Sequence, residues 1–206
     1  MNKLRFTNIL LLIIIEIVPS ILSKQTKIKN MNLMNEITII IKGTGTQRIL
    51  GEKAITPNQL YVNTYSRTAS KTISISSQPN TVRMVWNYQL SSCNSMFYGR
   101  ENIIEMDLSK FDSSQVTDMS DMFHLCTSLE SIDFTGINTH SLTNMNYMFY
   151  ECYSLQNLDL RSFDTSSVNT MFQTFFGCYS LVSVDLSSFD TSSVTLCFKC
   201  FSNVIT

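Results

Sequence analysis

Hydrophobic positions in the second half of the chain recur with a constant period of 26 residues. The same offset connects several independent columns of residues: Phe97, Phe123, Phe149, Phe175 and Phe201; Met119, Met145, Met171 and Cys197; Cys126, Cys152 and Cys178; Phe111, Ile137, Phe163 and Phe189. A fixed period of this length, without insertions, is typical of repeat architectures in which each unit stacks on its neighbours. Residues 85–206 are therefore predicted to hold about four repeats, the last one incomplete.

Each repeat is predicted to contain a strand, a turn, a short helix and a second turn. Leu155, Leu158, Leu160 and Phe163 form the pattern LxxLxLxxF, whose middle alternates as in a β-strand. The Asp-Thr-Ser-Ser-Val sequence that follows is rich in side chains that close turns. Apolar residues then come at spacings that fit one face of a helix: Val116, Met119, Met122, Phe123 and Cys126. Stacked copies would form an α/β solenoid, a short leucine-rich-repeat-like array with its strands on the concave side.

The N-terminus has the pattern of an exported protein. Lys3 and Arg5 precede an apolar run over residues 9–15, and the small residues Ser20 and Ser23 follow, which is the order found in a signal peptide over residues 1–23. Cleavage after either serine is compatible with this pattern. Glu16 cuts the apolar run short of the roughly 20 residues that a membrane span needs. Secretion or cell-surface display is expected, with no transmembrane span after signal cleavage.

Two further segments precede the repeats. Residues 24–35 are polar and are predicted to be a flexible lead. Residues 36–84 hold β-branched runs separated by glycine and proline, which indicates a small antiparallel sheet. Because the first unit of a solenoid exposes an apolar end, this β-rich segment is predicted to be its N-terminal cap.

The repeat resembles the 26-residue surface repeat of BspA-like leucine-rich-repeat proteins of bacteria and protists. The resemblance rests on the motif LxxLDLSxFDTSSVTxMxxMFxxCxSL, whose clearest copies are Leu155 to Met171 and Leu181 to Val194. The sequence departs from the motif at Arg100, which takes the place of the cysteine. The resemblance implies display at the cell surface, adhesion or binding to host and matrix, and no shared catalytic activity.

Composition removes several other classes of function. The chain has 15 Lys and Arg against 16 Asp and Glu, so it lacks the positive surplus that nucleic acid requires. Its two histidines, His124 and His140, are substitutions within single repeats, and no glycine-rich phosphate loop is present. No enzyme activity and no cofactor are therefore predicted.

The cysteines have competing interpretations. Cys126, Cys152 and Cys178 share one register, and they are either buried thiols of the apolar core or partners in bridges between repeats. Cys197 and Cys200 resemble half of a redox or zinc site, but they also occupy the registers of Met119 and Met122. A zinc site needs four ligands and no second pair lies at a suitable spacing, so no metal is predicted.

A row of aspartates is the candidate binding site. Asp107, Asp133, Asp159 and Asp185 lie between the apolar strand positions and are expected on the concave face. The predicted ligand-binding strip adds neighbouring polar residues: Glu105, Ser109, Thr135, Asn157, Arg161 and Ser187. The competing interpretation is structural, with each aspartate bonding to local backbone groups and keeping the face soluble.

Other polar and aromatic positions are predicted to be structural. Asp112, Asn138, Asp164 and Asp190 precede hydroxyl residues and are expected to cap the helix that follows. Trp86, Tyr88, Phe97 and Tyr98 lie at the junction of the cap and the first repeat, where aromatic rings either fill the junction or form a contact patch.

The sequence thus predicts a secreted or cell-surface interaction protein that binds an extracellular protein or glycan. Phe201, Val204 and Ile205 would complete half a repeat without a polar cap, so self-association through this end is a second expectation. The alternative function is a truncated or assembly-dependent structural surface component with no ligand of its own.

Overall fold

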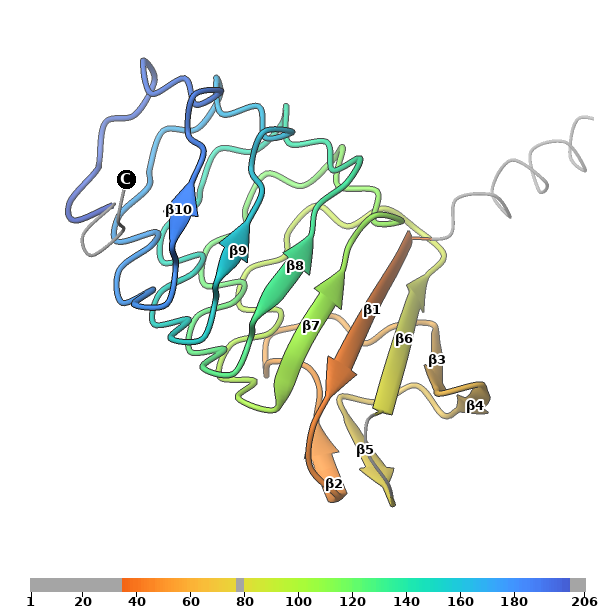
Figure 1. Ribbon diagram of the computed structural model, residues 1–206. Coiled ribbons are helices and arrows are strands. Elements are labelled where there is room, and N and C mark those ends of the chain that lie inside the picture. Colours follow the sequence, from red (N-terminus) through yellow and green to blue (C-terminus); the bar gives the residue numbers. More distant parts are fainter. Residues whose placement is uncertain (1–34, 77–79, 201–206) are drawn as a thin grey trace, which may run out of the picture. The chain divides into compact units, whose positions relative to one another are not determined.

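The computed structural model describes residues 35–76 and 80–200. In them, eight strands form one mixed sheet in the order β10-β9-β8-β7-β1-β6-β3-β4, and β2 pairs with β5 in a small second sheet (Figure 1). The strands are β1 (Asn35–Ile41), β2 (Gly45–Arg48), β3 (Gln59–Val62), β4 (Tyr65–Arg67), β5 (Thr72–Ile75), β6 (Asn80–Trp86), β7 (Ile103–Asp107), β8 (Ser131–Asp133), β9 (Asn157–Leu158) and β10 (Ser183–Val184).

The β-rich segment before the repeats joins the sheet through β1. This strand lies between β6 and β7 and is antiparallel to both. Its alternate residues Ile37, Ile39 and Ile41 are fully buried in the core, as the period of a half-buried strand requires. The first repeat is therefore covered by a strand from the N-terminal segment.

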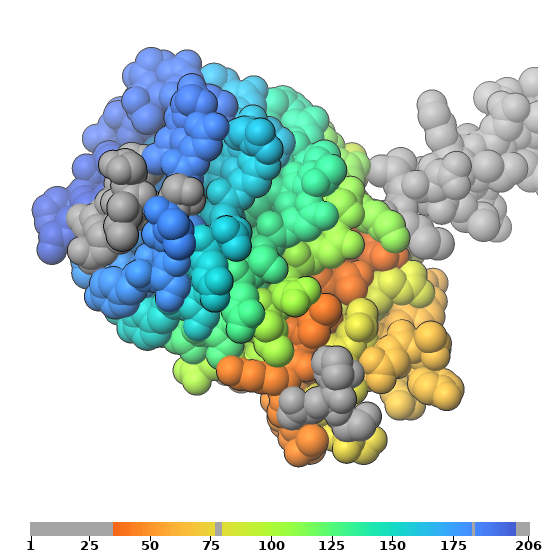
Figure 2. Space-filling model, in the orientation of Figure 1, coloured from red at the N-terminus to blue at the C-terminus, as the bar shows by residue number. Residues whose placement is uncertain are grey.

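The repeats lie side by side in the predicted register. Strands β7 to β10 are parallel, and Glu105, Ser131, Asn157 and Ser183 pair in sequence, each 26 residues after the last. Figure 2 shows the successive repeats as adjacent bands of one surface. In the core the phenylalanine column stacks, with ring centroids 5.3 Å apart between Phe123 and Phe149 and 5.4 Å apart between Phe149 and Phe175.

The predicted fold class, an α/β solenoid with helical units, is wrong. The described residues contain no helix, and the strands belong to a mixed sheet. The segment predicted to be helical makes two consecutive β-turns, in which the Met122 N–H donates to Met119 O and the Cys126 N–H donates to Phe123 O. Asp121 and Leu125 have φ angles of 55° and 59° at the third positions of these turns, which no α-helix allows.

The same residue spacing explains the error. The first and last residues of two consecutive four-residue turns follow the pattern i, i+3, i+4, i+7, which is also the apolar face of a helix. In the structure the first residues of the two turns, Met119 and Phe123, direct their N–H groups to the next repeat, where Asn144 O and Met148 O accept them at 3.0 and 2.9 Å. The prediction that the strands lie on a concave side was argued from bulky helices, and the described residues contain no helix.

Buried side chains also join neighbouring repeats. The Thr139 hydroxyl donates to Asp164 O at 3.0 Å and accepts the Asp164 N–H at 2.8 Å, and Ser113 and Thr165 make the corresponding pair of bonds. The Cys126, Cys152 and Cys178 thiols each donate to a phenylalanine carbonyl of the preceding repeat at 3.1 Å. These three cysteines are free and buried, so the thiol interpretation holds over bridges between repeats.

The predicted helix caps are also corrected. Asp112, Asp164 and Asp190 each accept the N–H of the residue two positions later, at 3.1, 3.0 and 2.8 Å, and Asn138 does the same for His140. Because no helix follows, these side chains close local turns instead.

Several expectations fall on residues beyond those described. The signal peptide at 1–23 and the apolar end formed by Phe201, Val204 and Ile205 lie outside the described residues. The flexible lead predicted at 24–35 also lies outside them except for Asn35, which is the first residue of β1. Within 35–76 and 80–200 the structure has no helix that could cross a membrane.

Candidate functional site: the outer face of the mixed sheet

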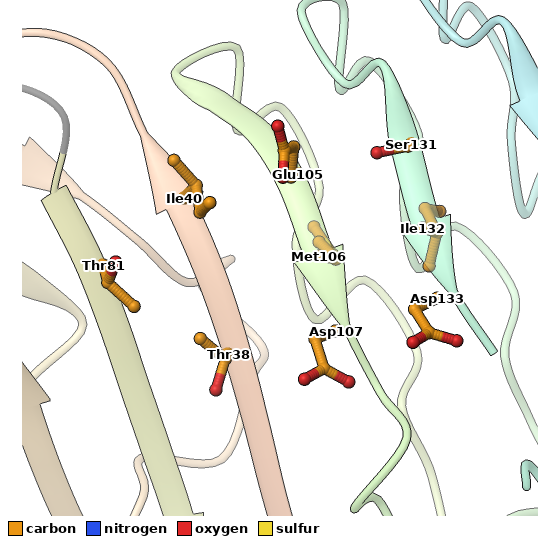
Figure 3. Close-up of a pocket in the computed structure, with 9 residues that line it drawn as sticks. All are labelled: Thr38, Ile40, Thr81, Glu105, Met106, Asp107, Ser131, Ile132 and Asp133. Atoms are coloured by element: carbon orange, nitrogen blue, oxygen red, sulfur yellow. The ribbon is translucent and has the colours of Figure 1, made fainter. Parts of the chain in front are cut away.

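Alternation along short strands places the predicted acidic strip on the outer face of the sheet. Met106, Ile132 and Leu158 point into the core and are 3%, 7% and 5% exposed. The residues on either side of them point outward, and Figure 3 shows Glu105, Asp107, Ser131 and Asp133 along β7 and β8. Asp107 and Asp133 are direct partners across these two strands. Asp159 and Asp185 follow β9 and β10 at the same register.

Each aspartate of the strip closes a turn with the residue two positions later. The carboxylates of Asp107, Asp133 and Asp185 accept backbone N–H groups at 2.8, 2.8 and 2.9 Å from Ser109, Thr135 and Ser187. This is the geometry of an Asx turn, and it fixes the direction of each carboxylate. The structural interpretation of the row is therefore supported by local bonds, while Asp133, Asp159 and Asp185 stay exposed to solvent.

Arg161 compensates one charge of the row. Its Nε and one terminal nitrogen donate to the two oxygens of Asp159 at 2.9 and 2.6 Å. These hydrogen bonds, with that from the Arg161 backbone, lower the pKa of Asp159 to about 2. The pKa values of Asp133 and Asp185 are also lowered, first by hydrogen bonds from the Thr135 and Ser187 side chains. The row therefore carries negative charge at neutral pH.

A shallow hollow of about 500 Å³ lies over this face where the repeats meet the N-terminal strands. Its floor and rim come from β1, β6, β7 and β8 (Figure 3): Thr38, Ile40, Thr81, Glu105, Met106, Asp107, Ser131, Ile132 and Asp133. A second hollow of about 440 Å³ shares Ile132 and Asp133 with it and continues past Thr135 to Asp159 and Arg161. The two hollows adjoin and form one depression, which is lined by six of the predicted residues: Glu105, Asp107, Asp133, Thr135, Asp159 and Arg161. The other four predicted residues line neither hollow: Ser109, Asn157, Asp185 and Ser187.

Sequence reasoning missed the contribution of β1 and β6 to this face. Thr38, Ile40 and Thr81 line the hollow because β1 inserts between β6 and β7. The alternation of β1 indicated which of its residues point outward, but not which strand it pairs with. Glu36 lies on the same strand and binds both Arg83, at 2.9 Å, and Lys110 of the first repeat, at 3.5 Å.

The remaining candidate groups have local partners. His124 Nδ1 lies 2.6 Å from Asp121 Oδ1, and its ring packs between Tyr98 and Tyr150, both with centroids at 4.6 Å. Cys197 and Cys200 form a disulfide. Of the junction aromatics, Trp86 and Phe97 are fully buried and fill the core, whereas Tyr88 and Tyr98 are 42% and 40% exposed. Among the described residues no cluster of His, Cys, Asp and Glu has the arrangement of a metal site.

Comparison with known proteins adds one match. No curated protein and no solved structure matches the chain. One family of proteins matches it twice, over residues 76–180 and 132–206, and these ranges include all the repeats and the acidic row. The chain therefore belongs to the family described as Mycoplasma protein of unknown function, DUF285.

Proposed function

We propose that this protein is a secreted or cell-surface interaction module whose outer sheet face binds an extracellular protein or glycan. The observation that carries the proposal is the row of aspartates that recurs at one register in successive repeats, with each carboxylate oriented by its own turn. The resemblance of the repeat to BspA-like surface repeats supports the same class of function.

The spacing of the row favours a partner rich in positive charge or hydrogen-bond donors. Neighbouring strands lie about 4.8 Å apart, and like charges at that distance repel each other. Arg161 offsets one charge, and the exposed carboxylates of Asp133 and Asp185 remain available to a partner. Bound cations or donors would relieve the repulsion, so the row is suited to electrostatic recognition.

The form of the hollow favours an extended partner over a small substrate. Pockets for small molecules enclose most of the surface of their ligand. The depression here is shallow and runs across β1, β7, β8 and the residues after β9. A peptide segment or an oligosaccharide laid across the strands would contact several repeats at once.

The test is binding of the labelled full chain to an array of extracellular matrix proteins and glycans. The double variant Asp133→Asn/Asp185→Asn removes two charges and keeps an oxygen for each Asx turn. We expect binding to at least one array member to fall at least tenfold in this variant. The control Asp164→Asn/Asp190→Asn removes the same charge from two exposed, turn-closing aspartates that line neither hollow on the sheet, and it should bind as the parent does. Equal binding by the two variants, or no binding at all, would contradict the proposal.

A specific observation also favours the alternative of an assembly-dependent structural component. Three large apolar side chains of the last described repeat are exposed: Val182, Leu196 and Phe198, at 69%, 48% and 53%. This alternative pairs the last repeats of two copies. Light scattering after size exclusion distinguishes the two: dimers that Phe198→Ser dissociates would support assembly, and a monomer at all concentrations would exclude it.

A further inference from the structure

A third hollow, separate from the two on the sheet face, lies where the segment after β2 meets the first repeat. Its volume of about 500 Å³ equals that of the hollow over β7 and β8, and it differs from that hollow in the charge of its lining. Three cationic side chains line it, Arg48, Lys53 and Arg100, together with the carboxylates of Glu52 and Asp121. Ser95 and Tyr98 complete the lining. None of these residues lines the acidic depression on the sheet.

The two walls of this hollow are held together by close backbone contact. The Gly51 N–H donates to Met96 O at 2.7 Å. A Cβ atom at Gly51 would lie 2.1 Å from Ser95 O, so only glycine permits this approach. Arg48 and Lys53 lie on either side of Gly51 in sequence, so the backbone between them is anchored against the first repeat.

Arg100 is the distinctive residue of the hollow. It occupies the register at which the following repeats have Cys126, Cys152 and Cys178. Its Nε donates to Tyr98 O at 3.0 Å, which fixes the direction of the guanidinium and leaves its terminal nitrogens to face other groups. Partial burial and the nearby positive charge of Arg48 both lower the pKa of Arg100. Arg48 and Arg100 both line the hollow, so an anion bound there would be attracted by two guanidinium groups.

Arg48 is available to such an anion. Its ion pair with Glu52, 3.2 Å long, has side chains that are 41% and 81% exposed. Exposed pairs of this kind contribute little to stability, so a ligand carboxylate can compete for the guanidinium at small cost. A planar guanidinium binds carboxylates with two parallel hydrogen bonds, which are among the strongest in proteins.

Tyr98 adds an aromatic surface beside the cations. One side of its ring packs on His124, at a centroid distance of 4.6 Å, and the ring also lines the hollow. Tyr98 is the first ring of an aromatic column that continues through His124 and Tyr150. The electron-rich face of an aromatic ring attracts the C–H groups of a sugar, and the carboxylates of Glu52 and Asp121 can accept its hydroxyl hydrogens.

We propose that this hollow binds a carboxylate-bearing sugar unit of an acidic glycan. The sugar carboxylate lies between Arg48 and Arg100, and the pyranose ring packs against Tyr98. Lys53 adds positive charge at the mouth of the hollow. The site is independent of the acidic row, which takes partners of the opposite charge.

Calorimetric titration of the full chain tests the proposal with three probes: glucuronate, glucose and acetate. We expect glucuronate to bind more tightly than acetate, and glucose not to bind measurably. Binding of glucuronate should weaken when the salt concentration rises, because charge contributes to it. Equal affinity for acetate and glucuronate would overturn the proposal, since a bare carboxylate, as on an acidic peptide, would then be sufficient.

Four variants locate the site. Arg48→Gln and Arg100→Gln should each weaken glucuronate binding at least tenfold, and Tyr98→Ala should weaken glucuronate but not acetate. The control Arg67→Gln removes the same charge from β4 at the far edge of the sheet and should leave binding unchanged. Thermal melts establish that each variant is folded. Unchanged affinity in Arg48→Gln and Arg100→Gln, or an equal loss in Arg67→Gln, would overturn the assignment.

Discussion

The N-terminal strands and the strands of the repeats share one sheet but are stabilised differently. β1 and β6 each have seven residues and pair along their whole length. In the repeats the strands shorten from five residues in β7 to two in β9 and β10. The repeats are joined mainly by three other kinds of contact: the stacked phenylalanine column, the backbone hydrogen bonds from the turn segments such as Met119–Cys126, and the bonds of the buried hydroxyl and thiol groups. A sheet can therefore continue through strands of only two residues when contacts outside the strands hold the repeats together.

The largest effect is expected from the core column of the repeats. Phe149 is fully buried between Phe123 and Phe175, and its ring is at 84° to that of Phe134. Phe149→Ala should lower the free energy of unfolding by about 3–5 kcal/mol, as buried aromatic truncations do. Denaturant melts measure this. Asp159→Ala, on the exposed face, is the control and should change stability far less; equal losses would contradict the assigned inner and outer faces.

Gly51→Ala tests the close contact between the N-terminal segment and the first repeat. The added Cβ would meet Ser95 O at 2.1 Å, so the backbone must move. We expect a loss of up to about 3 kcal/mol, at the upper end of ordinary overpacking. Glu52→Ala, at the exposed neighbouring position, should change the melting temperature little. If Gly51→Ala melts as the parent does, the close contact is not maintained in solution.

The bonds between repeats are tested by Thr139→Val. Valine has the same shape but leaves the Asp164 N–H and carbonyl without the bonds that the Thr139 hydroxyl makes. Leaving buried polar groups unsatisfied should cost about 1–3 kcal/mol. Thr143→Val removes a bond of 2.9 Å that lies near the surface, where water can replace it, and should cost less. The reverse order in urea melts would show that the buried hydroxyl column does not join the repeats.

The smallest effect is the acid dependence of the strip. The pKa of Asp159 is lowered to about 2 in the folded protein, whereas the pKa of an aspartate in the unfolded chain is about 3.9. The ionised carboxylate therefore makes its full contribution to folding stability above about pH 3.9. It is lost as the pH falls through about 2, and the lowered pKa values of Asp133 and Asp185 act in the same direction. Asp159→Asn should therefore flatten the loss of stability between pH 4 and 2 (the window given by these shifts). A variant as acid-sensitive as the parent would contradict this.

The register of the repeats could be predicted from the sequence, and their secondary structure only in part. Identical positions recur at 26 residues, so the columns of Phe149 and Cys152 were visible as patterns. The turns of residues 119–126 could not be predicted, because two consecutive four-residue turns and an amphipathic helix bury the same positions. Leu125 and Tyr147 adopt positive φ angles there, although neither residue type favours them. Asp121 does so too, but aspartate is common in many other conformations and gives no clear signal.

The candidate sites show the same division. The acidic row followed from strand alternation within the repeats, and Asp107, Asp133, Asp159 and Asp185 do share one face. The contribution of Thr38, Ile40 and Thr81 depends on β1 pairing with β7, a contact between distant segments that no local pattern encodes. The hollow around Arg100 was likewise hidden, although its one visible signal was an arginine at a register of cysteines.

The turn-side hydrogen bonds have a direction that gives the array an electrical polarity. In the repeats up to residue 175 the N–H groups at registers such as Met119 and Phe123 donate to carbonyls of the following repeat. The aligned peptide dipoles therefore add, as they do along an α-helix, and the carbonyl end carries partial negative charge. That end is the first repeat, where Met96 O accepts the Gly51 N–H and Tyr98 O accepts the Arg100 guanidinium. The gathering of Arg48, Lys53 and Arg100 at this end thus has a counterpart in the cations that stabilise the C-terminus of a helix.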